Sequence, residues 1–484
     1  MNRGPTVSAE RCKWAGQMSG RPRWVGLAVV LALLVWGCQT TPEGQESGSI
    51  QPQLTQQPKT SITASIDRKS VTLFEPLRPT GATPNHLNLL APQGPSTPEP
   101  EVTEIDAWRV ALLVPLTGRG AAIGRALLDA AQLALFETAQ DDLELLIFDT
   151  QGTVVGAEDA ARLAVADGAR LILGPLFGAS AQAVRPVVEA AGISAVSFSN
   201  NRDIAGGGVH VFGFLPDQQV RRIISYAAGK GHVAIGALVP SSGFGELVVA
   251  TARIAAEQHG AGITRATYYD PNDTELSSLI RRFADYDSRK SALSAQKRVL
   301  LQKTDQISRR ALERLSGLET LGAPPFDSVL LPAGDPELRG LAPLLAFYDV
   351  DPARVRLLGT ALWDEARGLG VEPTIVGGWY AAPSPKAWGL FEDKFERAFA
   401  KRPPRLASLG YDAMLLAVAL TYGERGANYE PAALTDVSGF AGVDGIFRLL
   451  ADGTNQRGLA VIEVEERGVQ VIDPAPSSFA DLQF

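Results

Sequence analysis

The glycine-rich stretch "VPLTGRGAAIG" joins an apolar run to an apolar-periodic segment, as in strand–loop–helix units that bind phosphate. A dinucleotide-binding fingerprint beginning at Gly118 and Gly120 requires its third glycine at the position of Ile123, because close strand–helix packing depends on that spacing. Asp149 ends the second apolar run, where a ribose-binding acid stands in such proteins. One near-match of this kind does not favour nucleotide binding.

Other residue patterns that carry catalysis are missing. The stretch "SSGFG" lacks the glycine two residues before a nucleophilic serine, and no C-x-x-C or H-E-x-x-H spacing occurs. Four histidines and two cysteines in 484 residues leave little for metal chemistry. The formal charge of −8 provides no basic field for nucleic acid. We therefore predict a non-enzymatic protein with no cofactor, no metal site and no nucleic-acid partner.

Small, hydroxyl-rich loops follow several of the apolar runs. In open α/β sheets, ligands bind beyond the carboxyl ends of the strands, where backbone N–H groups and helix N-termini favour a carboxylate or another anion. We therefore predict a cleft for a small molecule at these loops. The alternative is that serine and asparagine side chains only cap helices. The candidate ligand-binding residues are Thr117, Phe177, Ser180, Ser197, Ser199, Asn200, Ser241, Phe244 and Trp363.

Strand-like and helical segments alternate from Asp106 onward. The first strands, such as "RVALLVPL" and "LELLIFDT", are nearly continuous apolar runs, as expected when both faces of a strand are buried. Amphipathic helices separate them, so the alternation predicts an α/β fold with doubly wound parallel sheets. The pattern restarts after "HVFGFLPDQQ", which predicts two lobes joined by a hinge near residues 214–216.

The predicted boundaries divide each lobe into two sequence segments. The first lobe comprises residues 106–215 and 383–437, and the second comprises residues 216–382 and a C-terminal hairpin over 438–473. The hairpin is predicted from two apolar strands around a D-G turn. A tail of residues 474–484 follows. The returning helix "GYDAMLLAVALTYG" is expected to be buried in the first lobe.

Residues 1–37 have the features of a bacterial signal peptide. Two arginines precede 13 apolar residues, "WVGLAVVLALLVW", a length that suits the h-region of a signal better than a membrane span. The following "VWGC" resembles a lipobox, which predicts lipidation of Cys38. An ordinary signal peptide or a membrane anchor is the alternative, and Met18 is an alternative to Met1 as the first residue.

Removal of this signal peptide would leave an acidic chain. The first 37 residues contain five basic residues and one acidic residue, so the charge of −8 becomes −12 without them. Gln39 follows Cys38, and the lack of an aspartate there predicts transport to the outer membrane, facing the periplasm. Ten of the 32 prolines fall within residues 39–105, which predicts that residues 38–105 are a disordered tether.

A basic, helical segment over residues 287–321 interrupts the acidic chain. It carries eight lysines and arginines, a local reversal of charge that indicates a surface for a partner. Arginines on such a surface would steer the encounter electrostatically. A solvated helix on one lobe is the alternative. The candidate partner-binding residues are Arg298, Arg309, Arg310 and Arg314.

Several stretches together resemble the type I periplasmic-binding-protein fold of leucine/isoleucine/valine-binding proteins. They cover nearly all of residues 106–470 and include "VALLVPLTGRGAAIG", "LILGPLFGASAQAV", "ISAVSFSNN", "SLGYDAMLLA" and "GFAGVDGIFRLLADG". Within that fold, "FDSVLLPAG", "GTALWDE" and "GGWYAAPSP" are most similar to the penicillin-binding protein activator (LpoA-like) branch. Members of that branch are outer-membrane lipoproteins that stimulate a class A penicillin-binding protein. They carry a helical N-terminal domain where this chain has the predicted tether.

The resemblance implies a regulator of peptidoglycan synthesis that binds and activates a class A penicillin-binding protein, with membrane contact through the lipid alone. The lipobox, the tether and the basic segment support this function. The alternative is a periplasmic solute-binding lipoprotein that delivers an amino acid or small peptide to an ABC transporter, which the predicted cleft supports. The residues that clamp an amino acid in such receptors are not evident in the second lobe.

Overall fold

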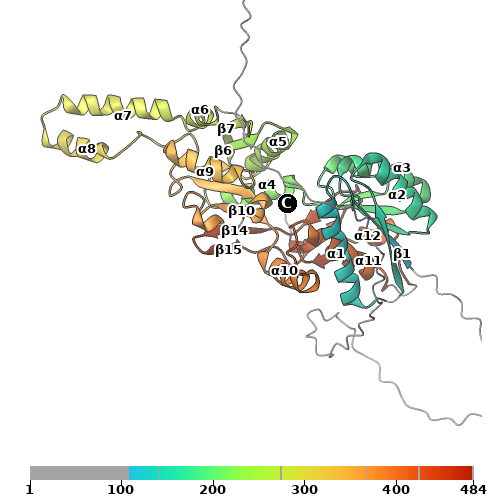
Figure 1. Ribbon diagram of the computed structural model, residues 1–484. Coiled ribbons are helices and arrows are strands. Elements are labelled where there is room, and N and C mark those ends of the chain that lie inside the picture. Colours follow the sequence, from blue (N-terminus) through green and yellow to red (C-terminus); the bar gives the residue numbers. More distant parts are fainter. Residues whose placement is uncertain (1–107, 141, 273–274, 367, 423–425, 482–484) are drawn as a thin grey trace, which may run out of the picture. The chain divides into compact units, whose positions relative to one another are not determined.

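The computed structural model describes residues 108–481 except 141, 273–274, 367 and 423–425 (Figure 1). The predicted signal peptide, Cys38 and the predicted tether lie outside the described residues. Two large sheets with helices on both faces, and one small sheet, make up the described region. This architecture confirms the predicted α/β class with two doubly wound lobes.

The first sheet has five parallel strands in the order β2-β1-β3-β4-β5. β1 lies between β2 and β3, so Val110 is opposite Leu145 on one side and Leu171 on the other. The run from Val110 to Val114 is fully buried, which explains its continuous apolar sequence. The strands are β1 (Trp108–Val114), β2 (Leu143–Asp149), β3 (Leu171–Leu173), β4 (Ser194–Ser197) and β5 (Val209–Val211).

Helices cover both faces of the first sheet. On one face α1 (Ala121–Thr138) packs against α11 (Ala407–Ala419), and both helices share a hydrophobic core with β1. On the other face α2 (Val154–Ala166) and α3 (Gly178–Ala191) enclose a second core. α11 comes from a distant part of the sequence, and all but two of its residues are buried, as predicted for the returning helix.

The second sheet has seven strands in the order β15-β14-β10-β9-β8-β6-β7. The strands β6 to β10 run parallel, whereas β14 pairs antiparallel with β10 and with β15. Helices α4 and α5 pack on one face, and α6 and α9 pack on the other. The strands are β6 (Ala234–Pro240), β7 (Gly262–Tyr269), β8 (Ser328–Leu330), β9 (Arg356–Thr360), β10 (Trp379–Ala382), β14 (Ala460–Glu465) and β15 (Gly468–Asp473), and the helices are α4 (Pro216–Gly229), α5 (Gly243–Gln258), α6 (Leu276–Phe283) and α9 (Glu337–Phe347).

The C-terminal segment is divided between two sheets, which corrects the single second-lobe hairpin predicted over residues 438–473. β12 (Gly445–Leu449) and β13 (Asn455–Arg457) form a hairpin, and β11 (Phe440–Gly442) completes a small antiparallel sheet. This small sheet contributes Phe447 to the core of the first lobe, whereas β14 belongs to the second sheet. Short apolar runs such as β12 and β14 look alike in sequence, so periodicity could not assign them to different sheets.

The chain passes between the two lobes three times. It leaves the first sheet after β5, returns after β10 through α10 (Pro385–Phe399), and leaves again between β13 and β14. β10 ends at Ala382. α4 begins at Pro216, because proline suits the first position of a helix. The remaining short elements are α12 (Pro431–Leu434), η1 (Arg202–Ile204), η2 (Ala361–Glu365), η3 (Leu369–Val371) and η4 (Phe479–Asp481).

Candidate functional site

The glycines between β1 and α1 are explained by backbone packing. A Cβ on Gly124 would lie only 1.9 Å from the carbonyl oxygen of Pro115, so the first turn of α1 can approach the end of β1 only with glycine there. Gly118 and Gly120 have φ angles of +67° and +81°, a conformation that glycine adopts without steric cost. The loop therefore needs its glycines whether or not an anion binds.

Asp149 ties this loop to the loop after β2. Its Oδ1 accepts hydrogen bonds from the backbone N–H groups of Leu116 and Gln151 at 2.8 and 2.7 Å. Its Oδ2 accepts a hydrogen bond from the hydroxyl of Thr117 at 2.6 Å. Desolvation opposes ionisation, but the hydrogen bonds from these neighbours outweigh it and lower the pKa of Asp149. The carboxylate thus braces two loops, which accounts for an acid at this position without a ribose.

The hydroxyl candidates of the first lobe all form hydrogen bonds within the protein. Ser180, Ser197 and Ser199 are buried, whereas Thr117 is exposed. These bonds leave each hydroxyl oxygen able to accept a further hydrogen bond. The bonds are Thr117 Oγ1 to Asp149 Oδ2 (2.6 Å), Ser180 Oγ to the carbonyl of Thr153 (3.3 Å), Ser197 Oγ to the carbonyl of Pro175 (2.9 Å) and the N–H of Asn201 to Ser199 Oγ (3.1 Å).

Phe177 and Asn200 are the other first-lobe candidates, and both have accessible side chains. Phe177 precedes α3 and is half-buried, with the guanidinium carbon of Arg119 lying 5.0 Å from its ring centre. Asn200 is exposed in the loop after β4. Loops after β1, β3 and β4 all lie at the carboxyl edge of one parallel sheet. The structure therefore places Thr117, Phe177 and Asn200 on the same edge, and their ligand-binding role stays a prediction.

The second-lobe candidates differ from one another in exposure. Ser241 is exposed, and its backbone N–H donates to the carbonyl of Tyr269 at 2.7 Å. Phe244 is half-buried and packs against the core beneath α5. Trp363 is only 1% exposed, and its indole N–H donates to the carbonyl of Leu331 at 3.1 Å. These contacts assign the Trp363 side chain to the core, so it presents no surface to a ligand in this conformation.

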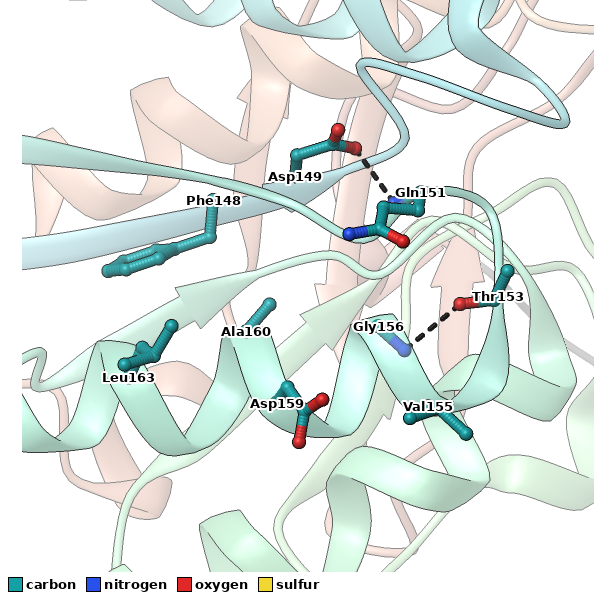
Figure 2. A pocket seen from close by; sticks show the side chains of 9 residues that line it. All are labelled: Phe148, Asp149, Gln151, Thr153, Val155, Gly156, Asp159, Ala160 and Leu163. Carbon is teal, nitrogen blue, oxygen red and sulfur yellow. Dashed lines mark hydrogen bonds between the residues drawn. The ribbon is translucent and has the colours of Figure 1, made fainter.

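Two cavities in the described region are lined by residues other than the nine candidates. One, of about 260 Å³, is lined by residues of β2 and α2 and is mixed in character, with Phe148, Val155 and Leu163 beside Asp149 and Asp159 (Figure 2). The other, of about 650 Å³, lies between the first turns of α1 and residues 401–404. Neither cavity is lined by a residue of the predicted ligand set.

The basic segment forms two helices, α7 (Tyr286–Leu301) and α8 (Gln306–Ser316), that pack against each other and extend away from the second sheet (Figure 1). The four candidate cations are all exposed, and within the described part of the chain none of them forms an ion pair; they are Arg298, Arg309, Arg310 and Arg314. Their role toward a partner stays a prediction.

Arg289 behaves differently from the other basic residues of the hairpin. It is buried at the base of α7, where Nη2 lies 3.0 Å from Asp349 Oδ2. Its Nε donates to the carbonyl of Gly322 at 3.2 Å. Burial lowers the pKa of Arg289, and the charge of Asp349 opposes that change. Arg289 therefore anchors the hairpin to the second lobe and is not available to a partner.

A buried cluster of four charged side chains was missed by the sequence analysis. Arg405 Nη2 lies 2.7 Å from Oδ1 of the fully buried Asp444. Asp412, in α11, accepts two successive backbone N–H groups before β12 at 2.7 and 3.3 Å. Arg457 donates to the carbonyl of Phe212 at 2.8 Å, and its guanidinium carbon lies 4.6 Å from the centre of that ring. The four residues are thereby held among hydrogen bonds and aromatic rings.

Burial controls the ionisation of this cluster. Desolvation, followed by the negative charge of Asp444, raises the pKa of Asp412 to about 7. Desolvation also lowers the pKa of Arg457, against the charges of Asp444 and Asp412. In Arg405, desolvation acts in the same direction, but the charges of Asp444 and of Asp364, whose Oδ2 lies 3.5 Å from Arg405 Nε, outweigh it and raise the pKa. A lone acid in the apolar helix "SLGYDAMLLA" is the sequence signal that could have revealed the cluster.

The described region was found to contain neither a metal-binding cluster nor a membrane-spanning helix. Among its residues, no group of three or more histidine, cysteine, aspartate or glutamate side chains could hold a metal ion. No described helix is long and apolar enough to span a membrane. The arrangement instead offers loops at the edge of a parallel sheet and a projecting basic hairpin, both of which suit binding.

The chain matches a known protein family. The profile of the periplasmic binding protein family matches residues 107–469, so the chain belongs to the periplasmic binding protein family. An ABC transporter substrate-binding protein from Sphaerobacter thermophilus has the same fold, with a TM-score of 0.57 and 18% identity over 76% of this chain and 98% of that one. Family membership fits a location in the cell envelope.

Two curated relatives match shorter segments. The penicillin-binding protein activator LpoA of Photobacterium profundum is 30% identical over 149 residues, which are 30% of this chain and 24% of LpoA. The uncharacterized protein RP748 of Rickettsia prowazekii is 24% identical over 178 residues, which are 36% of this chain and 47% of that protein. The matched segments thus span less than half the length of each curated relative.

Proposed function

We propose that this chain is a non-enzymatic, outer-membrane lipoprotein that regulates peptidoglycan synthesis by binding and activating a class A penicillin-binding protein. The observation that carries the proposal is the 30% identity to LpoA over 149 residues. Lipidation at Cys38 would hold the chain at the outer membrane, and residues 38–105 would act as the tether that lets the two lobes reach the synthase. The two lobes then supply a binding surface and no catalysis.

The α7–α8 hairpin is the surface we assign to the synthase. Its arginines at 298, 309, 310 and 314 are exposed and have no ion-pair partner among the described residues, so their charge is available to an acidic surface. Unpaired exposed cations steer association, and salt screens them. Docking would activate the synthase by binding its more active conformer better than its less active one.

The test is a binding titration of the full-length chain, in mild detergent, against the periplasmic part of each class A penicillin-binding protein of the host. A peptidoglycan cross-linking assay follows each titration. We expect saturable binding that weakens with salt, together with faster cross-linking. The charge-reversed variant R309E/R310E/R314E should bind at least tenfold more weakly at low salt, because it replaces attraction with repulsion.

A matched variant separates the hairpin from total charge. R253E/R397E/R467E reverses three exposed arginines outside the hairpin and changes the net charge by the same amount. It should bind as the unmodified chain does. Equal loss in both variants would contradict a docking role for the hairpin, and no binding to any class A synthase at micromolar concentration would contradict the proposed activity.

The family supports one competing function, the binding of a small solute at the loops that carry Thr117, Phe177 and Asn200. Thermal unfolding with amino acids, small peptides and muropeptides tests it. A solute at about 100 times its dissociation constant would stabilise the folded chain by roughly 2.7 kcal/mol. A chain that binds such a solute and no synthase would be a solute-binding lipoprotein, of the kind that serves ABC transporters.

A further inference from the structure

The tip of the α7–α8 hairpin exposes aliphatic side chains that its own folding does not need. Leu301, the last residue of α7, is 67% exposed, and Ile307, in the first turn of α8, is 78% exposed. On α7, Leu293 and Leu300 are buried, and α7 packs against α8. The exposed pair therefore contributes little to the stability of the hairpin.

The base of the α7–α8 hairpin is anchored to the second lobe, so the tip projects from a rigid base. The buried guanidinium of Arg289 bonds to both the carbonyl and the carboxylate of Asp349 at 3.0 Å. The backbone N–H of Leu321, after α8, donates to the carbonyl of Arg289 at 3.0 Å. These bonds join the start of α7 to the segment after α8, and the two helices extend beyond this junction (Figure 1).

Positive charge surrounds the aliphatic tip. Lys303 lies in the loop between Leu301 and Ile307, and Arg298 and Arg310 lie one turn away on each helix. Within the described residues none of these three cations has an ion-pair partner. The nearby carboxylate of Asp305 is engaged in capping α8, where it accepts the N–H and the hydroxyl of Ser308 at 2.9 and 2.7 Å.

We propose that Leu301 and Ile307 are the anchors of the interface and insert into a shallow apolar pocket, rimmed by carboxylates, on the partner protein. The inference rests on the proposed function, and it adds which residues hold the complex and what surface receives them. The carboxylate rim of the partner's pocket is inferred from charge complementarity. Leu301 and Ile307 lie among unpaired cations, so the matching surface is an apolar site surrounded by acidic residues.

A lipid surface is a poorer match for this tip. Elements that insert into the membrane interface usually present aromatic and leucine side chains along a whole helical face. Here the exposed aliphatic side chains near the end of the hairpin are Val299, Leu301 and Ile307, with Val299 the least exposed. The only aromatic residue between 286 and 321 is Tyr286, at the base. A compact, rigid tip suits a pocket in a folded protein better than a bilayer.

The two kinds of residue should affect different rate constants. Unpaired exposed cations act on the approach of the partners, so their loss lowers the association rate and its salt dependence. Buried aliphatic anchors act after docking, so their loss raises the dissociation rate. Binding kinetics can therefore distinguish an anchor from a charge that only steers.

The experiment measures association and dissociation rates of the full-length chain, in mild detergent, with the class A synthase at several salt concentrations. For L301S/I307S we expect a dissociation rate at least tenfold higher, with the association rate and its salt dependence unchanged. The control V371S/V437S removes two aliphatic side chains that are 77% and 76% exposed elsewhere, and it should leave both rates unchanged. Thermal unfolding of both variants should match that of the unmodified chain.

The alternative outcomes are separable. Binding by the unmodified chain that survives L301S/I307S would overturn the anchor role and leave the proposed function standing. Failure of the unmodified chain to bind any class A synthase would overturn both. Co-sedimentation with vesicles of phosphatidylethanolamine and phosphatidylglycerol, abolished by L301S/I307S while synthase binding persists, would show that the tip contacts lipid and would overturn the protein pocket.

Discussion

Arginines occupy two opposite environments in this protein. In the first lobe, Arg457 is buried and the Arg405 side chain is only 10% exposed, close to Asp444 and Asp412. Arg405 contacts a carboxylate and an aromatic ring, and Arg457 contacts a carbonyl and an aromatic ring. On the α7–α8 hairpin, the arginines beyond the buried Arg289 are exposed and have no ion-pair partner among the described residues. The same side chain is thus part of the core in one region and part of the surface in the other.

This difference indicates which charged residues serve folding and which are candidates for binding a partner. A buried charge loses its hydration, so it survives only if its partners remain in place, and removing one partner is strongly destabilising. An exposed, unpaired charge contributes almost nothing to folding. The buried cluster therefore has a structural role that explains its presence, whereas folding does not explain the hairpin cations, which points to a partner.

Arg405→Met should have the largest effect on stability. It leaves Asp444 buried without its cation, which we expect to lower the free energy of unfolding by about 3–5 kcal/mol. Urea unfolding followed by circular dichroism measures the loss. Arg298→Met, on the hairpin, is the matched control and should change stability by less than about 0.5 kcal/mol.

A second variant keeps this prediction testable if Arg405→Met does not fold. Arg405→Met combined with Asp444→Leu removes both members of the closest buried pair. It should recover part of the lost stability, because Asp444 is no longer buried without Arg405, whereas Asp364 and Arg457 each still lose one charged neighbour. A double variant as unstable as the single one would show that Arg405 acts through packing against Trp388 and Phe214, whose ring centres lie 4.5 and 5.2 Å from its guanidinium carbon.

The next effect is a dependence of stability on pH that originates in Asp412. Its pKa rises from an ordinary value of 3.8 to about 7 in the folded chain. Between these values the folded chain retains a proton that the unfolded chain releases, so the free energy of unfolding falls as pH rises and levels off above about 7. The change is on the order of 2–4 kcal/mol, and urea unfolding between pH 5 and 8 measures it.

Asp412→Asn isolates this contribution from other titrating groups. The amide does not ionise, so the stability difference between the unmodified chain and the variant should shift in favour of the variant as pH rises. Parallel pH profiles for the two chains would show that Asp412 does not titrate in this range. The hairpin offers the contrast, since substitution of its exposed cations should leave the slope of the profile unchanged between pH 5 and 8.

Most of the fold was predictable because the inner strands are buried on both faces. The stretches containing β1 and β6 are continuous apolar runs between amphipathic helices, and that pattern alone indicates a parallel sheet. The C-terminal hairpin exists, but its assignment to the second lobe was wrong for a physical reason. The turn at Gly453 was correct, but pairing partners far apart in the sequence decide which sheet each strand joins.

The candidate site was less predictable, because burial depends on tertiary contacts. Trp363 follows a strand, and an aromatic residue there reads the same in sequence whether it points into a core or toward a ligand. Arg405 and Asp444 meet across 39 positions of sequence, so no local pattern pairs them. The hairpin cations were found because exposure on a polar helix pair requires no distant partner.

Arg289→Met tests whether loss of the buried cation of the hairpin destabilises the protein, as we expect for loss of Arg405 from the buried cluster. It removes hydrogen bonds to Asp349 and Gly322, so we expect a loss of about 2 kcal/mol confined to α7 and α8. Hydrogen exchange should show faster exchange in these two helices and unchanged exchange in β1 and β3. Faster exchange throughout both lobes would mean that the hairpin base supports the whole fold.

The smallest expected effect is that of R309E/R310E/R314E on stability. These side chains are exposed and unpaired within the described residues, so each substitution should change the free energy of unfolding by about 0.5 kcal/mol or less. Arg314 lies in the last turn of α8, where a glutamate also meets the negative end of the helix dipole, so it should account for most of any loss. Urea unfolding of the variant beside the unmodified chain measures it. A loss of several kcal/mol would contradict the difference between buried arginines, which stabilise the fold, and exposed ones, which do not. Weakened synthase binding by this variant would then result from unfolding of the hairpin and not from a missing contact.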